Sequence, residues 1–237
     1  MKRSLFILYL LIAPTVFAQV YKFNDAQVWF NLYLEKKITK KWLVHLNEQD
    51  RFTNNVTHFN FAYADVGITY KITKNIKIMA DYVFTQKRRP DESFSTYHQY
   101  YVAMTFKKDI KRWRFMYRNM FQFQYNNPFT SSTGMIPYYY DRNKFIIKYE
   151  LNKYYTLYAA EELYIPLNSP VTKGLDRSRT FVGLFYNIFK HHQLELYFMY
   201  QSRIQNSDWF RQRNYYPFYN YILEKDFVYG IGYSIDF

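Results

Sequence analysis

The last eleven residues of the chain, FVYGIGYSIDF, alternate between apolar side chains and small or polar ones. A period of two is typical of a β-strand with one apolar face and one polar face. The apolar positions are Phe227, Tyr229, Ile231, Tyr233, Ile235 and Phe237. A strand of a soluble β domain would show the same alternation, so the rest of the chain has to separate the two classes of fold.

The closing segment also carries a specific ending. Phe237 is the C-terminal residue and Tyr233 lies four residues before it. This arrangement resembles the terminal strand of bacterial outer-membrane β-barrel proteins. The resemblance implies that the barrel assembly machinery is a partner that reads this strand.

The N-terminus predicts a cleaved secretory signal peptide. A basic start, an apolar run over residues 5–13 that is too short to span a bilayer, and the sequence VFA before Gln19 fit that class. We therefore expect a signal peptide over residues 1–18 and one barrel domain over residues 19–237. The chain has no Cys, which excludes disulfides and thiolate ligands.

Composition favours a barrel over a soluble core. Aromatic residues reach 23%, although the mean hydropathy is only −0.44. Membrane barrels spread their apolar residues by alternation and place aromatic belts at both interfaces. The formal net charge is +13. Because an exported protein rarely meets nucleic acid, we expect outer-membrane lipids and lipopolysaccharide phosphates as partners instead.

Segments of about ten residues repeat this alternation along the chain. They predict strands at residues 25–35, 42–52, 59–71, 76–87, 96–107, 112–125, 142–151, 154–165, 177–189, 194–204 and 227–237, with residue 221 as the earliest start of the last strand. Short Lys-rich turns alternate with longer loops, as in transmembrane barrels. We therefore predict an all-β, transmembrane antiparallel β-barrel of about 10–12 strands, in the outer membrane of a Gram-negative bacterium.

The strand count raises a problem of parity. Eleven segments can be distinguished, whereas bacterial single-chain barrels have an even number of strands. With eleven, the first and last strands would run parallel. A break at residues 224–226, a segment 19–24 that threads the lumen, or one incomplete strand would restore an even count, and the sequence leaves these alternatives open.

Four stretches carry a family resemblance: AQVWFNLYLEKKITKKW, EELYIPL, RSRTFVGLFYNI and LELYFMYQSR. Together they are similar to an uncharacterised outer-membrane barrel family common in Bacteroidota, the domain of unknown function 2490. The resemblance covers the mature length and implies the barrel and its location. None of the stretches is a catalytic signature, so it implies no activity.

Many charged side chains fall on the inward face of the predicted strands. The candidate lumen-lining residues are Asp65, Asp81, Arg114, Arg118, Arg142, Lys144, Lys148, Glu162, Arg179, Glu195 and Arg203. Cross-strand pairing predicts the neighbours Lys144 and Glu162, Asp25 and Arg51, Arg118 and Tyr101, Arg179 and Arg203, and Asn187 and Glu195. Such charges either fill a narrow barrel with ion pairs or line a pore or pocket that favours anions.

The expected register places Asp65 beside Asp81. Two facing carboxylates repel each other unless a cation bridges them. An arginine from the sixth strand is the simplest bridge. A metal-binding or acid/base role is the alternative.

A lipid-modifying enzyme would need a reactive group at the membrane rim. His98, with Ser93 and Ser95 nearby, and His58 occupy such positions, but no hydrolase or deacylase motif accompanies them. The rim arginines Arg88, Arg89, Arg177, Arg211 and Arg213 are either solvated or bind lipopolysaccharide phosphates.

The sequence therefore predicts a non-enzymatic outer-membrane barrel with a structural role or a small pore. It assigns no catalytic residue, cofactor or metal ligand. Two alternatives stay open: a surface binding protein that acts through long extracellular loops, and an outer-leaflet lipid-modifying enzyme.

Overall fold

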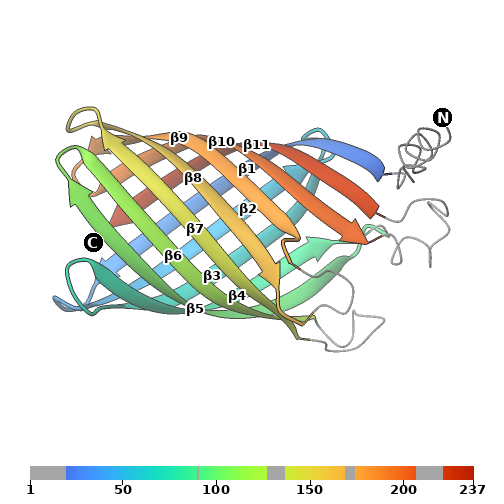
Figure 1. Ribbon diagram of the computed structural model, residues 1–237, viewed down its shortest axis with the longest axis horizontal. Coiled ribbons are helices and arrows are strands. Elements are labelled where there is room, and N and C mark those ends of the chain that lie inside the picture. Colours follow the sequence, from blue (N-terminus) through green and yellow to red (C-terminus); the bar gives the residue numbers. More distant parts are fainter. Residues whose placement is uncertain (1–19, 90, 127–136, 169–173, 207–220) are drawn as a thin grey trace, which may run out of the picture.

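The computed structural model describes residues 20–89, 91–126, 137–168, 174–206 and 221–237, and eleven strands in these ranges close into one barrel (Figure 1). Their bounds are β1 Val20–Lys37, β2 Trp42–Thr53, β3 His58–Lys71, β4 Ile76–Arg88, β5 Phe94–Ile110, β6 Trp113–Asn126, β7 Tyr138–Glu150, β8 Tyr155–Pro166, β9 Arg177–Phe189, β10 His192–Asn206 and β11 Tyr221–Asp236. The all-β barrel is confirmed. The expected signal peptide, residues 1–18, lies outside the described residues. No described helix is long and apolar enough to cross a membrane.

The barrel closes between β1 and β11, which run parallel from Val20 beside Tyr221 to Glu35 beside Asp236. All other neighbouring strands are antiparallel and follow one another in the chain. The count of eleven and the parallel closure are therefore confirmed, and the expectation of an even number is wrong. Residues 20–24 belong to β1 and do not thread the lumen. Parallel strands also form a continuous ladder of hydrogen bonds. The pairing of β1 with β11 therefore leaves no strand edge unpaired in a barrel with an odd number of strands.

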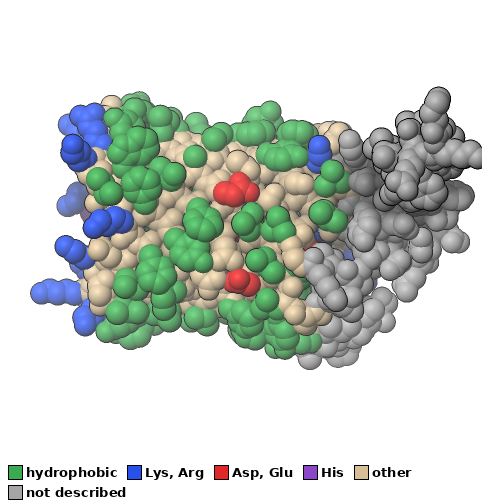
Figure 2. All heavy atoms as spheres, in the orientation of Figure 1, with side chains coloured by type: hydrophobic (Ala, Val, Ile, Leu, Met, Phe, Trp, Pro, Cys, Tyr) green, Lys and Arg blue, Asp and Glu red, His purple; other side chains and the backbone are tan. Residues whose placement is uncertain are grey.

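The connections sort by length between the two ends of the barrel. Turns of two to four residues join β1–β2, β3–β4, β5–β6, β7–β8 and β9–β10, and the C-terminus lies at that end (Figure 1). The start of β1 and the four-residue β2–β3 connection lie at the other end, together with the strand ends that flank the connections of 5 to 14 residues. Lys and Arg side chains gather around the short-turn end (Figure 2). The predicted sorting of loops holds for four of the five connections at that end, whereas the β2–β3 connection, with four residues, is as short as the turns at the opposite end.

The outer face of the barrel is mainly apolar and exposed, as the alternation predicts. Its side chains include Phe30, Leu32, Val44, Leu46, Val66, Ile68, Tyr100, Val102, Phe115, Phe121, Phe145, Ile147, Tyr229 and Ile231. The terminal residue also joins the wall, because the Phe237 amide donates to the Glu35 carbonyl at 2.8 Å. The closing strand thus presents the expected face outward.

Some outward positions are polar. Asn119 Nδ2 donates to Asp141 Oδ1 at 2.6 Å, and Tyr117 donates to Asn143 at 2.6 Å. On the next strands, Thr180 donates to Glu161 at 2.6 Å. Acidic side chains are visible within the apolar band in Figure 2. These groups satisfy one another across neighbouring strands, which lowers their cost on an apolar face.

The apolar core lies inside the barrel, against β1 and β8–β11. It consists of Trp29, Ala160, Phe181, Met199 and Val228. Beside it, the ring of Tyr197 lies over Gly230, where an added Cβ would come within 1.9 Å of the ring. Glycine therefore lets an aromatic ring lie flat against the wall, and one side of the barrel is filled while the rest of the lumen stays polar.

Candidate functional site

The lumen holds a central cavity of about 570 Å³ whose wall carries more positive than negative side chains. Nine cationic residues line it, against five carboxylates. The cations are Arg51, Lys87, Arg118, Arg142, Lys144, Lys148, Arg177, Arg179 and Arg203. The carboxylates are Asp65, Glu162, Glu195, Glu224 and Asp226. The cavity wall therefore has a formal excess of four positive charges, interleaved with tyrosines and amide side chains.

Glu162 is the centre of the basic wall. Its Oε1 receives hydrogen bonds from Arg118 at 3.0 Å and from Arg142 at 2.7 Å. Arg179 lies 3.9 Å from Oε2, and its Nη1 donates to the Tyr164 hydroxyl at 2.5 Å. Glu162 is only 2% exposed. One buried carboxylate thus holds three guanidinium groups in fixed positions on β6, β7 and β9.

Other cations of this wall contact aromatic rings. Lys144 Nζ lies 4.0 Å from the centre of the Phe181 ring, and Lys148 Nζ lies 4.1 Å from that of Phe185. Neither ammonium forms an ion pair with a carboxylate among the described residues. A ring face stabilises a cation without neutralising it. These two lysines therefore present positive charge to the cavity.

Arg51 is held in a similar way on β2. Its guanidinium carbon lies 3.7 Å from the Trp29 ring centre and 4.2 Å from that of Phe61. Its Nε donates to the Gln49 side chain at 2.7 Å. Among the described side chains, it has no carboxylate within ion-pair distance, so it adds a further accessible positive charge.

Most of the predicted lumen residues line this cavity. They are Asp65, Arg118, Arg142, Lys144, Lys148, Glu162, Arg179, Glu195 and Arg203. Arg114 instead lies exposed at the short-turn end, where it pairs with Asp109 at 2.6 Å. Asp81 is buried beside His45. The sequence did not assign Arg51, Lys87 or Arg177 to the lumen, and these three cations complete the basic lining.

The predicted cross-strand neighbours are only partly correct. Lys144 does pair with Glu162. The other registers are shifted by two or four residues. Arg51 pairs with Trp29, Arg118 with Thr105, Arg179 with Gln201, Arg203 with Arg177, and Asn187 with Gln193. The reason is that the ladders continue into tight turns, such as Ile110 beside Trp113, where longer turns had been expected.

Asp25 shows what replaces one of the expected ion pairs. Its carboxylate accepts hydrogen bonds from the backbone amides of Asn54 at 3.1 Å and Asn55 at 2.8 Å. Both residues have positive φ angles, of 54° and 53°. The carboxylate of Asp25 thus anchors the strained β2–β3 connection.

A second cavity, of about 690 Å³, lies at the short-turn end of the lumen. It shares the wall residues Asn31, Asn47, Phe185 and Glu195 with the central cavity. Tyr158 donates a short hydrogen bond to Glu195. The two cavities therefore adjoin along these shared wall residues.

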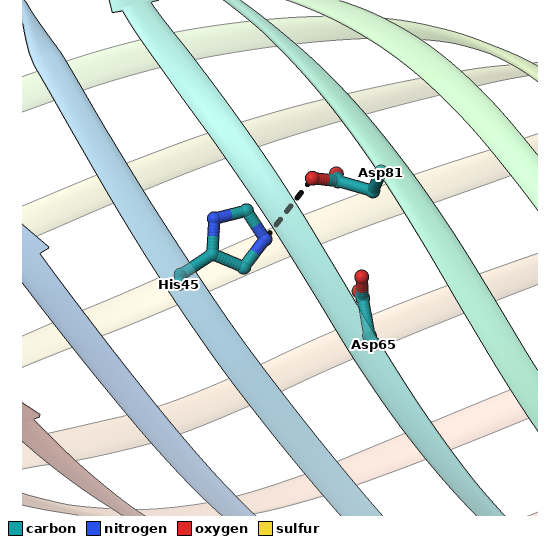
Figure 3. Close-up of side chains that lie close together, drawn as sticks. All are labelled: His45, Asp65 and Asp81. Carbon is teal, nitrogen blue, oxygen red and sulfur yellow. Dashed lines mark ion pairs between the residues drawn. The ribbon is translucent and has the colours of Figure 1, made fainter.

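Contrary to expectation, Asp65 and Asp81 do not lie directly opposite each other. Asp81 pairs with Gly67, and Asp65 pairs with Val83. His45 Nε2 lies 3.1 Å from Asp81 Oδ1 (Figure 3). Tyr101 donates to Asp65 Oδ2 at 2.6 Å. The expected arginine bridge is not formed, because Arg118 binds Glu162. The alternation along residues 42–52 places His45 on the inward face, but the sequence did not indicate Asp81 as its partner.

The rim residues considered for an enzyme have separate partners. The His98 ring lies 2.7 Å from the Tyr82 hydroxyl, and the His58 ring lies 2.7 Å from Thr57 Oγ1. Ser93 donates to Asp91 at 2.7 Å, and this hydrogen bond lowers the pKa of Asp91. Of the rim arginines, Arg177 lines the cavity, whereas Arg211 and Arg213 lie outside the described residues.

The comparisons with known proteins agree with this architecture. Residues 26–213 match the family model described as protein of unknown function, DUF2490. The barrel is also similar to a solved structure described as the NanC porin, with a TM-score of 0.51 and 16% sequence identity over 89% of this chain and 98% of that chain. At this identity the similarity shows the fold alone. No curated protein matches the chain.

Proposed function

The chain belongs to the DUF2490 family of proteins of unknown function, and on that premise we propose that it forms a passage for small anionic solutes in the outer membrane of a Gram-negative bacterium. The observation that carries this proposal is the excess of positive charge around the central cavity. Rings of cationic side chains favour anions in pores. The passage has no catalytic step in this proposal.

The membrane location is supported by the outer surface of the barrel. An apolar band covers it, and four of the five connections at one end are longer than the turns at the other end. Both features are typical of outer-membrane barrels. We also propose the barrel assembly machinery as a partner that would recognise the apolar outward face of β11. Separation of inner and outer membranes on a density gradient tests the location.

The anion preference is supported by how the cations are held. Glu162 fixes three arginines, while Lys144 and Lys148 rest on aromatic rings. A small anion could displace water from these lysines without breaking an ion pair. It would enter the lumen between the basic wall and polar side chains such as Gln99 and Gln122.

Uptake by proteoliposomes tests the proposed passage. Full-length protein is reconstituted, and the influx of an anionic solute is compared with that of a cationic solute of similar size. We expect faster influx of the anion. Equal exclusion of both solutes, or faster influx of the cation, would contradict the proposal.

A further inference from the structure

A second site of unlike character lies in the wall formed by β2, β3 and β4. His45 pairs with Gly67 across β2 and β3, and Gly67 pairs with Asp81 across β3 and β4. Asp65 precedes Gly67 by two residues and therefore shares its inward face. One ligand atom from each of His45, Asp65 and Asp81 lies within 4.8 Å of the other two (Figure 3).

The three side chains are buried and their polar atoms are incompletely satisfied. His45, Asp65 and Asp81 are 4%, 5% and 6% exposed. Asp65 Oδ1 and both Asp81 oxygens have no hydrogen-bond donor among the described residues. The contact of Asp81 Oδ1 with His45 Nε2, at 3.1 Å, is an ion-pair distance. Leaving buried carboxylate oxygens without donors is costly, so this arrangement favours a bound cation.

The charge of the cluster points to a divalent ion. One imidazole faces two carboxylates, and no Lys or Arg among the described residues forms an ion pair with either aspartate. A doubly charged cation with neutral His45 and two ionised aspartates makes the buried set electrically neutral. One nitrogen and two carboxylate oxygens form a ligand set that suits Zn²⁺ and leaves a position for water.

Neighbouring residues hold the three ligands in place. The Tyr101 hydroxyl binds Asp65 Oδ2 at 2.6 Å and leaves Oδ1 free to face the cluster. The Tyr33 ring stacks on His45 with a centroid distance of 5.5 Å. Partners of this kind orient metal ligands.

Gly67 makes the arrangement sterically possible. A Cβ at this position would lie 1.4 Å from Asp81 Oδ1 and 2.5 Å from His45 Cε1. Because Gly67 on β3 has no side chain, His45 on β2 and Asp81 on β4 can meet across β3. An ion pair between His45 and Asp81 alone would account for the glycine at position 67. It would leave the nearby Asp65 carboxylate without a cation.

We propose that His45, Asp65 and Asp81 bind one divalent transition-metal ion, with Zn²⁺ as the best match, inside the barrel wall. The ion links β2, β3 and β4. A tetrahedral site with bonds of about 2.0–2.2 Å separates its ligand atoms by about 3.4 Å. The His45–Asp81 contact is already close to this spacing, and the ligand atom of Asp65 lies within 4.8 Å of the other two.

Metal binding by the folded full-length protein tests this site. Protein in detergent is stripped with a chelator, dialysed against Zn²⁺ and analysed by mass spectrometry for metal content. We expect about one tightly bound Zn²⁺ per chain. The Co²⁺-loaded protein should show visible ligand-field bands that Zn²⁺ abolishes.

Variants separate this site from others. D65N and H45Q should each lower Zn²⁺ affinity by about 100-fold or more, and Y101F by about tenfold. The controls H191N/H192Q, in the β9–β10 turn, and D226N, a buried lumen carboxylate, should retain full affinity.

Failure to bind Zn²⁺ in the wild type, or equal binding by D65N, would overturn the proposal. Heat-dependent gel mobility reports whether each variant is folded. If D65N or H45Q does not fold, Y101F and the wild-type Co²⁺ spectrum decide the question: full affinity in Y101F together with absent bands would refute it.

Discussion

Two arcs of the barrel balance buried charge in opposite ways. On β6–β9, one carboxylate, Glu162, is shared by three arginines, and two lysines nearby rest on aromatic rings. On β2–β4, two carboxylates share one imidazole. The first arc therefore has positive charge to offer an anion, and the second has negative charge to offer a cation. The two arcs of the lumen wall therefore differ in the sign of their charge, although all the strands follow the same alternation of inward and outward residues.

The largest effect is expected from removing the centre of the basic arc. E162Q leaves three guanidinium groups without their shared carboxylate, and should lower the free energy of unfolding by about 3 kcal/mol. Denaturant unfolding in lipid vesicles measures this. The matched control is E161Q, because Glu161 is the adjacent outward residue and, among the side chains that the structure describes, accepts a hydrogen bond from Thr180 alone. It should change stability by less than about 0.5 kcal/mol, and equal effects of the two variants would remove the special role of Glu162.

Charge reversal of the two ring-supported lysines should change selectivity. In K144E/K148E the excess of four positive charges on the cavity wall becomes zero, so anion preference should fall strongly. Ion permeability ratios in planar bilayers measure this. K74E, in the exposed β3–β4 turn, makes a single charge reversal outside the lumen and should leave the ratio nearly unchanged; an equal loss in K74E would argue for a surface effect.

The acidic arc is tested by adding a methyl group at Gly67, where the His45 and Asp81 side chains meet across β3. G67A forces the Asp81 carboxylate away from His45, and overpacking of this kind should cost about 1–3 kcal/mol of unfolding free energy. The control G232A adds a Cβ that would lie 3.2 Å from the flexible Glu195 carboxylate, so it should cost less. A G67A protein as stable as wild type would show that the His45–Asp81 contact contributes nothing.

The smallest change in stability is expected at Asp25, whose carboxylate accepts hydrogen bonds from backbone amides. D25N weakens the hydrogen bonds to the amides of Asn54 and Asn55 and should cost about 1 kcal/mol. Hydrogen exchange of these two amides should accelerate. If their exchange rates stay the same, Asp25 does not anchor this connection.

The fold could be predicted from the sequence to a large extent because the alternation of side chains fixes which face each residue occupies. The outward set of β11, the sorting of loops and the parallel meeting of the first and last strands were all accessible in this way. The lumen residues followed from the same alternation, and nine of the eleven predicted positions line the central cavity.

The register could not be predicted, because a shift of two residues leaves every side chain on the same face. Arg118 was therefore placed beside Tyr101, whereas it pairs with Thr105 on β5 and binds Glu162. Asp65 and Asp81 were expected to face each other, but the contribution of His45 was not predicted, because the register of β2 against β3 was not known. His45 and Asp81 meet only because Gly67 lies between them, and that alignment spans three strands.

The reversal potential of the wild-type channel tests the central claim most directly. A planar bilayer containing the reconstituted protein separates two KCl solutions of different concentration. We expect a reversal potential of the sign set by chloride, and we expect it to shrink towards zero in K144E/K148E. A potential of the sign set by potassium, or no conductance, would contradict a lumen that favours anions.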